Sequence, residues 1–258
     1  MISVREAFKN GKAFIPFITC GDPHLDTTKK LIKAIAGAGA DLIELGIPFS
    51  DPTAEGPTIQ EANIRALSGG VTTDKIFDMV AEIRPEVDVP MVFMTYANVV
   101  YSYGTEKFVK KAAEAGMSGL ILPDVPYEEK DEFAPTCRKY GLDLISLIAP
   151  TSHDRIKMIA KDADGFVYCV SSLGVTGVRS NITTDIGSMT ALVHEANPDI
   201  PCAVGFGIST PEQAENIAKD ADGIIVGSAI VKQIAKYGKD AVQPVADYVR
   251  SMKEAANR

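Results

Sequence analysis

The sequence predicts one (β/α)8 TIM barrel with an extra N-terminal helix, a single domain over residues 1–258. A unit of short apolar strand, loop and amphipathic helix recurs along the chain, and eight strand candidates are present. No stretch has the composition of an interdomain linker or a low-complexity segment. The length of 258 residues, 46% of them apolar, suits one large core. Eight strands that alternate with helices form a parallel sheet, which closes naturally into a barrel.

The strand candidates are short apolar runs, as expected of parallel strands that are covered on both faces. They lie at residues 13–19, 42–47, 91–96, 119–123, 143–149, 165–170, 201–206 and 223–226. Helices are predicted between them, for example at residues 27–38, 74–84, 106–115, 128–140, 155–161, 211–219 and 240–256, and another begins near Pro57. Several of these helices end before a glycine, and we expect Gly39, Gly116 and Gly141 to cap their C-termini.

The composition argues against several classes of protein. The net charge is −8 and the sequence pI is about 5.0, which argues against a nucleic-acid surface. No apolar run approaches the ~18 residues of a membrane helix, and residues 1–12 resemble a short amphipathic helix rather than a signal peptide. The four cysteines form no CxxC pair, and the three histidines lack metal-ligand spacing. We therefore expect a cytoplasmic protein with reduced, mostly buried cysteines and no metal.

Residues 42–60, with the sequence LIELGIPFSDPTAEGPTIQ, carry two carboxylates of interest. Glu44 lies in an otherwise apolar strand, where a charge is costly unless it is paired or its pKa is shifted toward neutrality. Glu55 lies in the polar loop that follows this strand. One carboxylate on a rigid strand and another on a loop can act as acid and base around one substrate. The alternative for Glu44 is a buried ion pair with a lysine or arginine elsewhere in the chain.

The chemistry of such barrels lies at the C-terminal ends of the strands. After the seventh predicted strand, Gly207 begins a turn that leads into a capped helix with proline at its first position. Gly227 and Ser228 follow the eighth strand in the same way. Backbone N–H groups in these two loops often bind phosphate, and a side chain there would block the anion. We predict a phosphate site here; the alternative is that the glycines only make tight turns.

Large apolar and aromatic side chains also end many of the strands. They are Phe17, Met94, Tyr96, Ile148, Tyr168 and Phe206. Core packing is the best explanation for any one of them alone, but their shared position predicts an apolar pocket above the barrel core. The sixth strand continues into the polar, glycine-bearing segment 171–187, and long segments of this kind are usually lids or binding loops.

Residues 44–60 resemble the loop signature of the tryptophan synthase alpha subunit family, ELG-[IV]-PFSDP-x-A-[acidic]-GP-x-IQ, which is very specific. Other motifs of that family occur in family order and span all but the termini. They are PFITCGDP at 16–23, YANVVYSYG at 96–104, PDVPYEE at 123–129, GVTG at 174–177, GFGIS at 205–209 and VGSAIV at 226–231. By this resemblance the chain is identified as a member of the family.

The resemblance implies a lyase of tryptophan biosynthesis that cleaves indole-3-glycerol phosphate by a retro-aldol step, giving indole and glyceraldehyde 3-phosphate. It implies that Glu44 moves a proton to the indole ring and from the glycerol hydroxyl. A carboxylic acid with a raised pKa suits this role, because an indole carbon is a weak base. Glu55 is implied to hold the indole N–H, although the family usually has Asp there. Tyr168 is implied to lie near Glu44, and Thr176 to meet Glu55 when the lid closes.

The remaining residues implied by the resemblance bind the phosphate and the indole. The phosphate residues are Gly177, Gly207, Gly227 and Ser228, and the indole wall is formed by Phe17, Met94, Tyr96, Pro123, Ile148 and Phe206. No cofactor is implied for this chain, since pyridoxal phosphate is expected in a partner beta subunit within an alpha2-beta2 assembly. Residues 48–53 and 97–104 are the expected contacts, where loops would expose Phe49, Val100, Tyr101 and Tyr103. The alternative is that these side chains fold back on their own barrel.

Three other functions stay open at this stage. Another phosphate-binding barrel, such as an epimerase or sugar isomerase, would need a different acid and base and would leave SDPTAEGP unexplained. A stand-alone lyase that releases free indole differs from the alpha subunit only in its independence of a partner. A non-catalytic subunit that regulates a partner enzyme is kept open by Glu55 standing where the family usually has Asp, although Glu44 argues against it.

Overall fold

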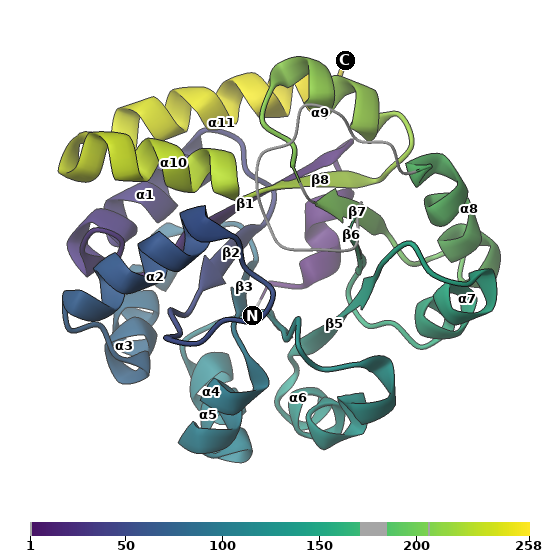
Figure 1. Ribbon diagram of the computed structural model, residues 1–258, viewed down its shortest axis with the longest axis horizontal. Helices are drawn as coiled ribbons and strands as arrows, with labels where there is room; N and C mark the ends of the chain where they lie inside the picture. Colours follow the sequence, from purple (N-terminus) through teal and green to yellow (C-terminus); the bar gives the residue numbers. More distant parts are fainter. Residues whose placement is uncertain (1, 171–184, 206) are drawn as a thin grey trace.

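Eight parallel strands form a closed barrel with the helices in a ring around it (Figure 1), which confirms the predicted TIM barrel. The computed structural model describes residues 2–170, 185–205 and 207–258. Each strand pairs with its neighbours in the sequence, and β8 closes the barrel on β1. The strands are β1 (Ala13–Thr19), β2 (Ile43–Gly46), β3 (Met91–Met94), β4 (Gly119–Ile121), β5 (Asp143–Ile148), β6 (Val167–Val170), β7 (Cys202–Gly205) and β8 (Gly223–Val226).

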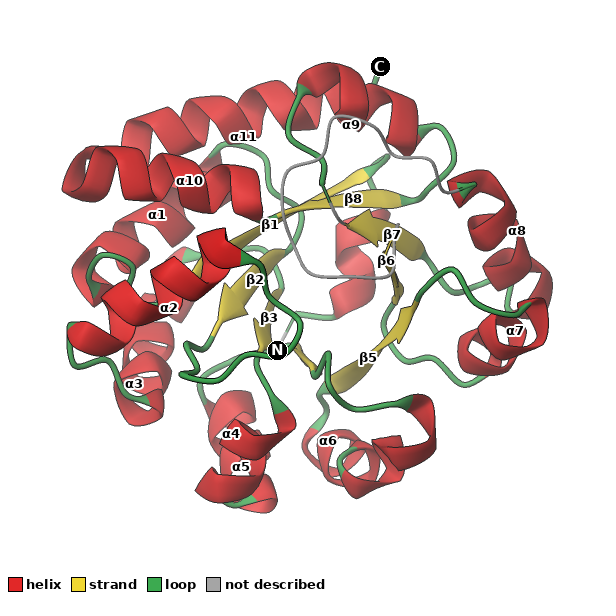
Figure 2. Cartoon of the chain, viewed as in Figure 1, coloured by secondary structure: helices red, strands yellow, loops and turns green. Residues whose placement is uncertain are grey.

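The helices follow the strands in the order expected of repeated β/α units (Figure 2). The α-helices are α1 (Leu25–Gly37), α2 (Pro57–Ser68), α3 (Thr73–Ile83), α4 (Ala97–Tyr103), α5 (Thr105–Glu114), α6 (Ala134–Tyr140), α7 (His153–Lys161), α8 (Ile186–Ala196), α9 (Pro211–Ala218), α10 (Ser228–Tyr237) and α11 (Val242–Ala256). Short 3-10 helices lie at Val4–Phe8, Arg84–Glu86, Tyr127–Glu132 and Gly238–Asp240. No helix of the described residues is both long and apolar enough to span a membrane.

Two predicted segments differ from the structure. The helix predicted at 128–140 is divided at Phe133 into a 3-10 helix and α6, because Pro135 is tolerated only in the first turn of a helix. The loop predicted at 97–104 is largely the helix α4. The carboxylate of Asp124 accepts the Ala97 N–H at 3.0 Å at the start of this helix. Val100 is fully buried, so packing of this helix against the barrel overrides the loop-like sequence.

The predicted loop 171–187 also differs from the structure at its C-terminal end. Helix α8 begins at Ile186, so Gly187 lies in its first turn, and residues 171–184 lie outside the described residues. The predicted C-terminal glycines are confirmed: Gly39, Gly116 and Gly141 have φ of 102°, 87° and 77°, a region that favours glycine. All four cysteines are buried and free, as expected.

Side chains of the strands alternate between two cores, because successive residues point to opposite faces of the sheet. One core lies between the strands and the helices. The other fills the barrel interior; its buried members are Val4, Ala7, Ala13, Ile15, Leu42, Val92, Ile121, Ile145, Phe166, Tyr168, Ala203 and Ile225. This interior cluster also includes residues of the N-terminal 3-10 helix, so that helix belongs to the barrel core.

The 3-10 helix Val4–Phe8 closes the end of the barrel at which the strands begin. The ring of Phe8 lies 5.5 Å from that of Phe166, just before β6. A Cβ atom placed on Gly223, the first residue of β8, would lie 3.2 Å from the Phe8 ring. The extra N-terminal helix is therefore a plug, and the opposite, C-terminal end of the strands is the end at which a ligand can enter.

Candidate active site

Glu44 lies on β2 and points into the barrel interior. Its register partners are Phe17 on β1 and Val92 on β3, and Val92 belongs to the interior cluster. Glu44 is 1% exposed, and its Oε1 atom has no hydrogen-bond partner in the part of the chain that the structure describes. Burial raises the pKa of Glu44 to about 8. Within the described part of the chain no lysine or arginine pairs with it, so nothing there supports the buried ion-pair interpretation.

Tyr168 on β6 fills the interior opposite this carboxylate. A Cβ atom placed on Gly205 would lie 2.5 Å from the Tyr168 hydroxyl, so this glycine of β7 makes room for the ring. Ala203 is the register partner of Tyr168, and Gly205 lies further along β7, so the ring leans toward the C-terminal mouth. Burial raises the pKa of Tyr168 well above its usual range, and the carboxylate of Glu44 adds to this rise. The two side chains therefore share one low-dielectric space.

Glu55 lies between β2 and α2, and its carboxylate is held by two other residues. Asn63 of α2 donates through Nδ2 to Glu55 Oε2 at 2.7 Å. The hydroxyl of Tyr96, just after β3, forms a hydrogen bond with the same carboxylate. Burial raises the pKa of Glu55 to about 7, and both hydrogen bonds act in the opposite direction. The second carboxylate is thus half-buried and aimed by side chains of the barrel.

The apolar residues predicted for a pocket wall are brought together only in part. Phe17 and Met94 pack in one cluster with Ile59, Ala62 and Val231 from the helices α2 and α10. This cluster lies at the same level of the barrel as Glu44, because Phe17 is the register partner of Glu44. One wall of the predicted pocket is therefore formed jointly by β1, β3 and two helices.

The other predicted wall residues lie elsewhere on the mouth or outside the described chain. Tyr96 is buried, and its ring lies 5.4 Å from that of Phe49. Pro123 is half-buried just after β4. Ile148 belongs to the cluster between strands and helices, whereas Leu147 packs on the interior, so Ile148 as a pocket residue stays a prediction. Thr176, Gly177 and Phe206 lie outside the described residues.

The two loops predicted to bind phosphate differ in how their helices begin. At α9, Thr210 and Gln213 form a capping box, so some of the backbone N–H groups at this helix N-terminus already have hydrogen-bond partners. Helix α10 begins after Gly227 with no side-chain cap, and Ser228 is its first residue. Gly207 has φ 82°, so the backbone conformation by itself is enough to favour glycine at this position. The helix cap predicted after β7 is confirmed. The helix N-terminus without a side-chain cap is that of α10.

Gly227 is not required by its own backbone angle or by close packing. Its φ is −114°, which any residue adopts. A Cβ atom placed there would lie 3.4 Å from Phe17, an ordinary van der Waals distance. The tight-turn explanation thus fits Gly207 better than Gly227, where the missing side chain leaves the helix terminus accessible.

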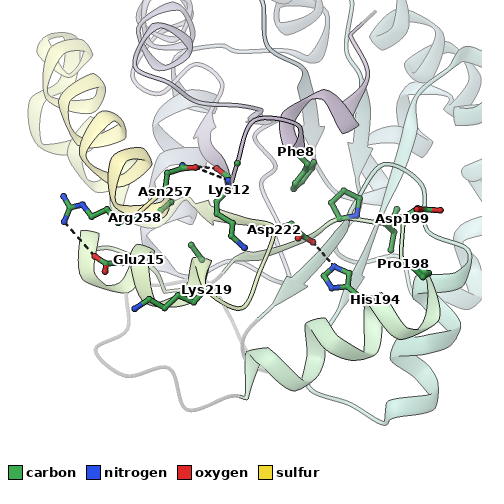
Figure 3. Close-up of a pocket in the computed structure, with 15 residues that line it drawn as sticks. Phe8, Lys12, His194, Pro198, Asp199, Glu215, Lys219, Asp222, Asn257 and Arg258 are labelled. Atoms are coloured by element: carbon green, nitrogen blue, oxygen red, sulfur yellow. Dashed lines mark hydrogen bonds and ion pairs between the residues drawn. The ribbon is translucent and has the colours of Figure 1, made fainter.

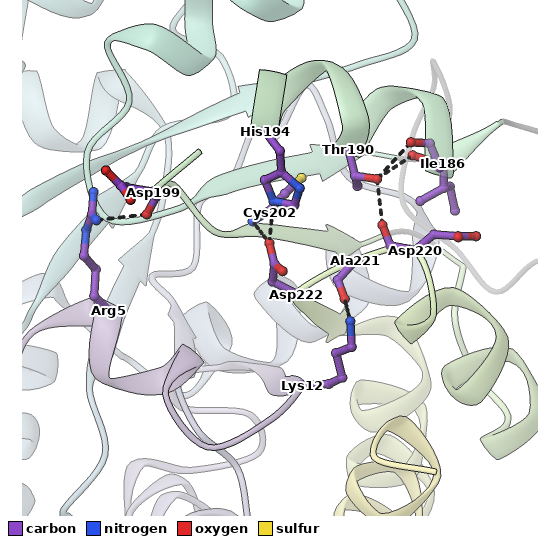
Figure 4. Close-up of polar contacts among 11 residues, drawn as sticks. Arg5, Lys12, Ile186, Thr190, His194, Asp199, Cys202, Asp220, Ala221 and Asp222 are labelled. Carbon is purple, nitrogen blue, oxygen red and sulfur yellow. Dashed lines mark hydrogen bonds and ion pairs between the residues drawn. The ribbon is translucent and has the colours of Figure 1, made fainter. Parts of the chain in front are cut away.

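A cavity of about 840 Å³ lies at the opposite end of the barrel, where the strands begin (Figure 3). Several of its charged groups already have protein partners. His194 Nε2 lies 2.8 Å from Asp222 Oδ2, which also accepts the Cys202 N–H at 2.8 Å, and Lys12 donates to the Ala221 carbonyl at 2.7 Å (Figure 4). These contacts join helices and strand ends at the barrel face that usually serves stability. The predicted active-site residues that the structure describes lie at the other end.

Comparison with known proteins decides the family. The model of the family described as "Tryptophan synthase alpha chain" matches residues 4–257. The chain is 46% identical to the tryptophan synthase alpha chain of Lacticaseibacillus casei over 257 residues, which cover 100% of this chain and 96% of that one. It is 48% identical to that of Lactiplantibacillus plantarum, covering 99% and 96% of the two chains. A solved structure of Mycobacterium tuberculosis tryptophan synthase superposes with a TM-score of 0.89 at 32% identity, over 100% of both chains.

The chain belongs to the tryptophan synthase alpha chain family. The resemblance inferred from the motifs is thereby confirmed over nearly the whole length. As a member of this family the chain is a lyase that cleaves indole-3-glycerol phosphate in tryptophan biosynthesis. The comparisons give no support to the other functions considered above.

Sequence reasoning missed several polar residues at the mouth. Asn63 is 4% exposed and lies on the buried stripe of α2. In the sequence, a polar residue on an otherwise apolar helix face is the pattern that could have indicated its role. Arg65 of α2 forms a bidentate ion pair with buried Asp22, both N···O distances being 2.8 Å. The Thr19 hydroxyl, at the end of β1, is buried without a hydrogen-bond partner. The Asn63–Glu55 bond spans eight residues and the Asp22–Arg65 pair spans 43, so neither contact follows from the periodicity of a single strand or helix.

The aromatic surface predicted for a partner is smaller than expected. Val100 is buried, and the Tyr103 ring packs against Phe77 at 5.7 Å between centroids. Phe49 is half-buried. Only Tyr101 of the four predicted residues is strongly exposed, at 71%. The alternative that these side chains fold back on their own barrel is therefore correct for Val100 and Tyr103.

Proposed function

We propose that Glu44 is the proton-transferring group in the cleavage of indole-3-glycerol phosphate by this chain. The supporting observation is a buried carboxyl group that has no charged partner among the described residues and whose pKa is raised to about 8. At neutral pH such a group is largely protonated and can donate its proton to an indole carbon. The carboxylate that this step leaves can then take the proton of the glycerol hydroxyl as the carbon–carbon bond breaks. The proton gained by the ring and the proton lost by the hydroxyl balance.

Glu55 and Tyr168 complete the proposed catalytic group. Glu55 accepts the indole N–H and so stabilises the positive charge that develops on the ring when its carbon is protonated. Tyr168 keeps its proton, because burial raises its pKa well above the usual range. It shares the interior with Glu44 and can donate a hydrogen bond there. Thr176 is proposed to meet Glu55 upon closure, as the family resemblance implies.

The phosphate is proposed to bind at the N-terminus of α10. Gly227 and Ser228 supply backbone N–H groups there, and Gly207 and Gly177 are proposed to complete the site. The uncapped terminus and the ordinary φ of Gly227 support this assignment. Indole is proposed to lie against Phe17, Met94, Tyr96, Pro123, Ile148 and Phe206. Binding of the phosphate away from the reacting bond helps to position the indole between the two carboxylates.

The partner is the beta subunit of tryptophan synthase, and pyridoxal phosphate belongs to that subunit rather than to this chain. We propose an alpha2-beta2 heterotetramer in the cytoplasm, with the strand C-terminal face of this barrel toward the beta subunit. Tyr101 is the exposed aromatic contact on this face that supports the proposal. Closure of the Glu55 loop in the complex would raise the rate of indole formation.

The test of the proposed function is indole formation from indole-3-glycerol phosphate by the pure chain, alone and with a beta subunit. We expect slow cleavage alone and faster cleavage in the complex. Equal rates with no complex at micromolar concentrations would indicate a stand-alone lyase. An absence of cleavage under both conditions, with a complex formed, would indicate a regulatory subunit.

Gly227→Val is expected to raise KM for indole-3-glycerol phosphate strongly, by roughly tenfold or more, while the fold is kept. The branched side chain would cover the N-terminus of α10, whereas the first carbon alone is accommodated beside Phe17. The measurement is KM, together with protection of the fold by glycerol phosphate in thermal melts. Gly227→Ala is the matched control and should change KM less. Unchanged affinity for glycerol phosphate in the valine variant would place the phosphate site elsewhere.

A further inference from the structure

Helix α2 presents a buried amide to the loop that carries Glu55. Asn63 is 4% exposed, and its Nδ2 atom donates to Glu55 Oε2 at 2.7 Å. An amide buried this deeply must be hydrogen-bonded, and here the carboxylate supplies the acceptor. The bond is charge-assisted whenever Glu55 is ionised, which makes it stronger than a bond between neutral groups.

The position of this amide is fixed by the packing of its helix. Ile59 and Ala62, on the same helix, pack in one cluster with Phe17 of β1 and Val231 of α10. Phe17 belongs to the proposed indole wall, and α10 begins at the proposed phosphate site. The amide therefore stands at a set distance from the surfaces that would hold both ends of the substrate.

Other hydrogen bonds also hold the loop near the carboxylate. Gln60 donates to the backbone carbonyl of Glu55 at 2.7 Å, and the Ala54 N–H donates to the Tyr96 hydroxyl at 3.1 Å. Tyr96 is the second side chain on the Glu55 carboxylate. Glu55 has more side-chain rotors than Asp would have, so without a partner on α2 its carboxylate could take several positions.

We propose that Asn63 is a positioning residue that holds the carboxylate of Glu55 at the place where it meets the indole N–H. This inference rests on the role proposed for Glu55. Asn63 acts through Glu55 and does not touch the substrate. Because it is neutral, it orients the carboxylate without adding a charge to the site, and it favours the ionised form that accepts an N–H.

The titratable groups around this carboxylate are few in the described part of the chain. Tyr96 contacts it directly, and Asp124 is the further acidic group that acts on Tyr96. Neither residue lies on α2. Removal of the amide should therefore shift the acid side of the pH profile of kcat to higher pH, because the ionised form of Glu55 loses a donor.

Asn63→Leu tests the proposal, because leucine has a similar volume and no donor. We expect kcat to fall roughly tenfold to a hundredfold, as for a misplaced catalytic group, with KM for indole-3-glycerol phosphate little changed. The acid limb of the kcat profile should move to higher pH. Asn63→Ser, which is too short to reach the carboxylate, is the second variant if the leucine variant does not fold. Gln60→Ala is the matched control, since the Gln60 amide donates to the backbone carbonyl of Glu55 rather than to its carboxylate, and it should leave the acid limb in place.

The decisive comparison is made in the Glu55→Ala background. If Asn63 acts through Glu55, Asn63→Leu should have no further effect on kcat there. A full additional loss in the double variant would overturn the proposal and assign Asn63 to the general packing of α2. Native kcat in Asn63→Leu, with Glu55→Ala inactive, would also overturn it while leaving the role of Glu55 intact. Full activity of Glu55→Ala would instead refute the proposed role of Glu55 itself.

Discussion

Glu44→Gln is expected to lower kcat for indole formation by about 10²–10⁴-fold, so that little measurable cleavage remains. The amide keeps the shape of the side chain and can donate hydrogen bonds, but it cannot exchange a proton. KM should change little, because the phosphate and the indole wall still hold the substrate. The measurement is kcat at saturating indole-3-glycerol phosphate, with circular dichroism as the control for folding.

The pH dependence of kcat in the native chain also tests the role of Glu44. Burial raises the pKa of Glu44 to about 8, so the protonated acid is lost as pH rises through that value, and kcat should fall there. Glu55, with a pKa of about 7, should be ionised above that pH, which places an acid limb on the other side. An acid limb and a base limb of this kind together give a bell-shaped profile. Near-native turnover in Glu44→Gln would exclude Glu44 as the acid. Unfolding of the variant would instead favour a structural role for its charge.

Glu55→Ala is expected to lose most of kcat, by roughly 10²-fold, because the charge that develops on the protonated indole loses its anionic partner. The fold should be kept, since Glu55 is half-buried in a loop and its removal leaves no charge unpaired. Asn63 would lose its acceptor, at a cost of about 1–3 kcal/mol in stability. The measurement is kcat together with the melting temperature. Nearly full activity would make Glu55 an ordinary loop charge.

Glu55→Asp is the more discriminating companion variant. Aspartate is one methylene shorter, and the contacts to Asn63 and Tyr96 are made by the glutamate carboxylate. We therefore expect the aspartate variant to be about twofold to fivefold slower than the native chain, equivalent to about 0.5–1 kcal/mol. A large acceleration would mean that the native glutamate is a handicap. In that case a mainly regulatory role for this subunit would gain support.

The barrel and the place of Glu44 could be predicted because both depend on regular, local patterns. Strand alternation alone puts Leu42, Glu44 and Gly46 on one face, and the structure has Leu42 in the interior cluster. The glycine caps follow from the same kind of rule, since a positive φ excludes most side chains. Loop motifs then identified the family, because SDPTAEGP has a meaning that periodicity does not supply.

The partners of the loop carboxylate could not be predicted in the same way. Asn63 on α2 meets Glu55 across a separation of eight residues, which local alternation does not predict, and Tyr96 reaches the same carboxylate from just after β3. Tertiary packing also decided that residues 97–103 form a helix, since Val100 is buried against the barrel. The contrast between Gly207 and Gly227 needed backbone angles, because both look like turn glycines in the sequence.

Glu44 can act as an acid near neutral pH because it is a buried carboxyl group with a raised pKa. The most direct measurement is a ¹³C-NMR titration of the chain labelled at its glutamate side-chain carboxyl carbons, with Glu44→Gln to assign the resonance. We expect the resonance that is missing from the variant to titrate near pH 8 in the native chain. Titration of that resonance near 4.5, the ordinary value, would contradict it.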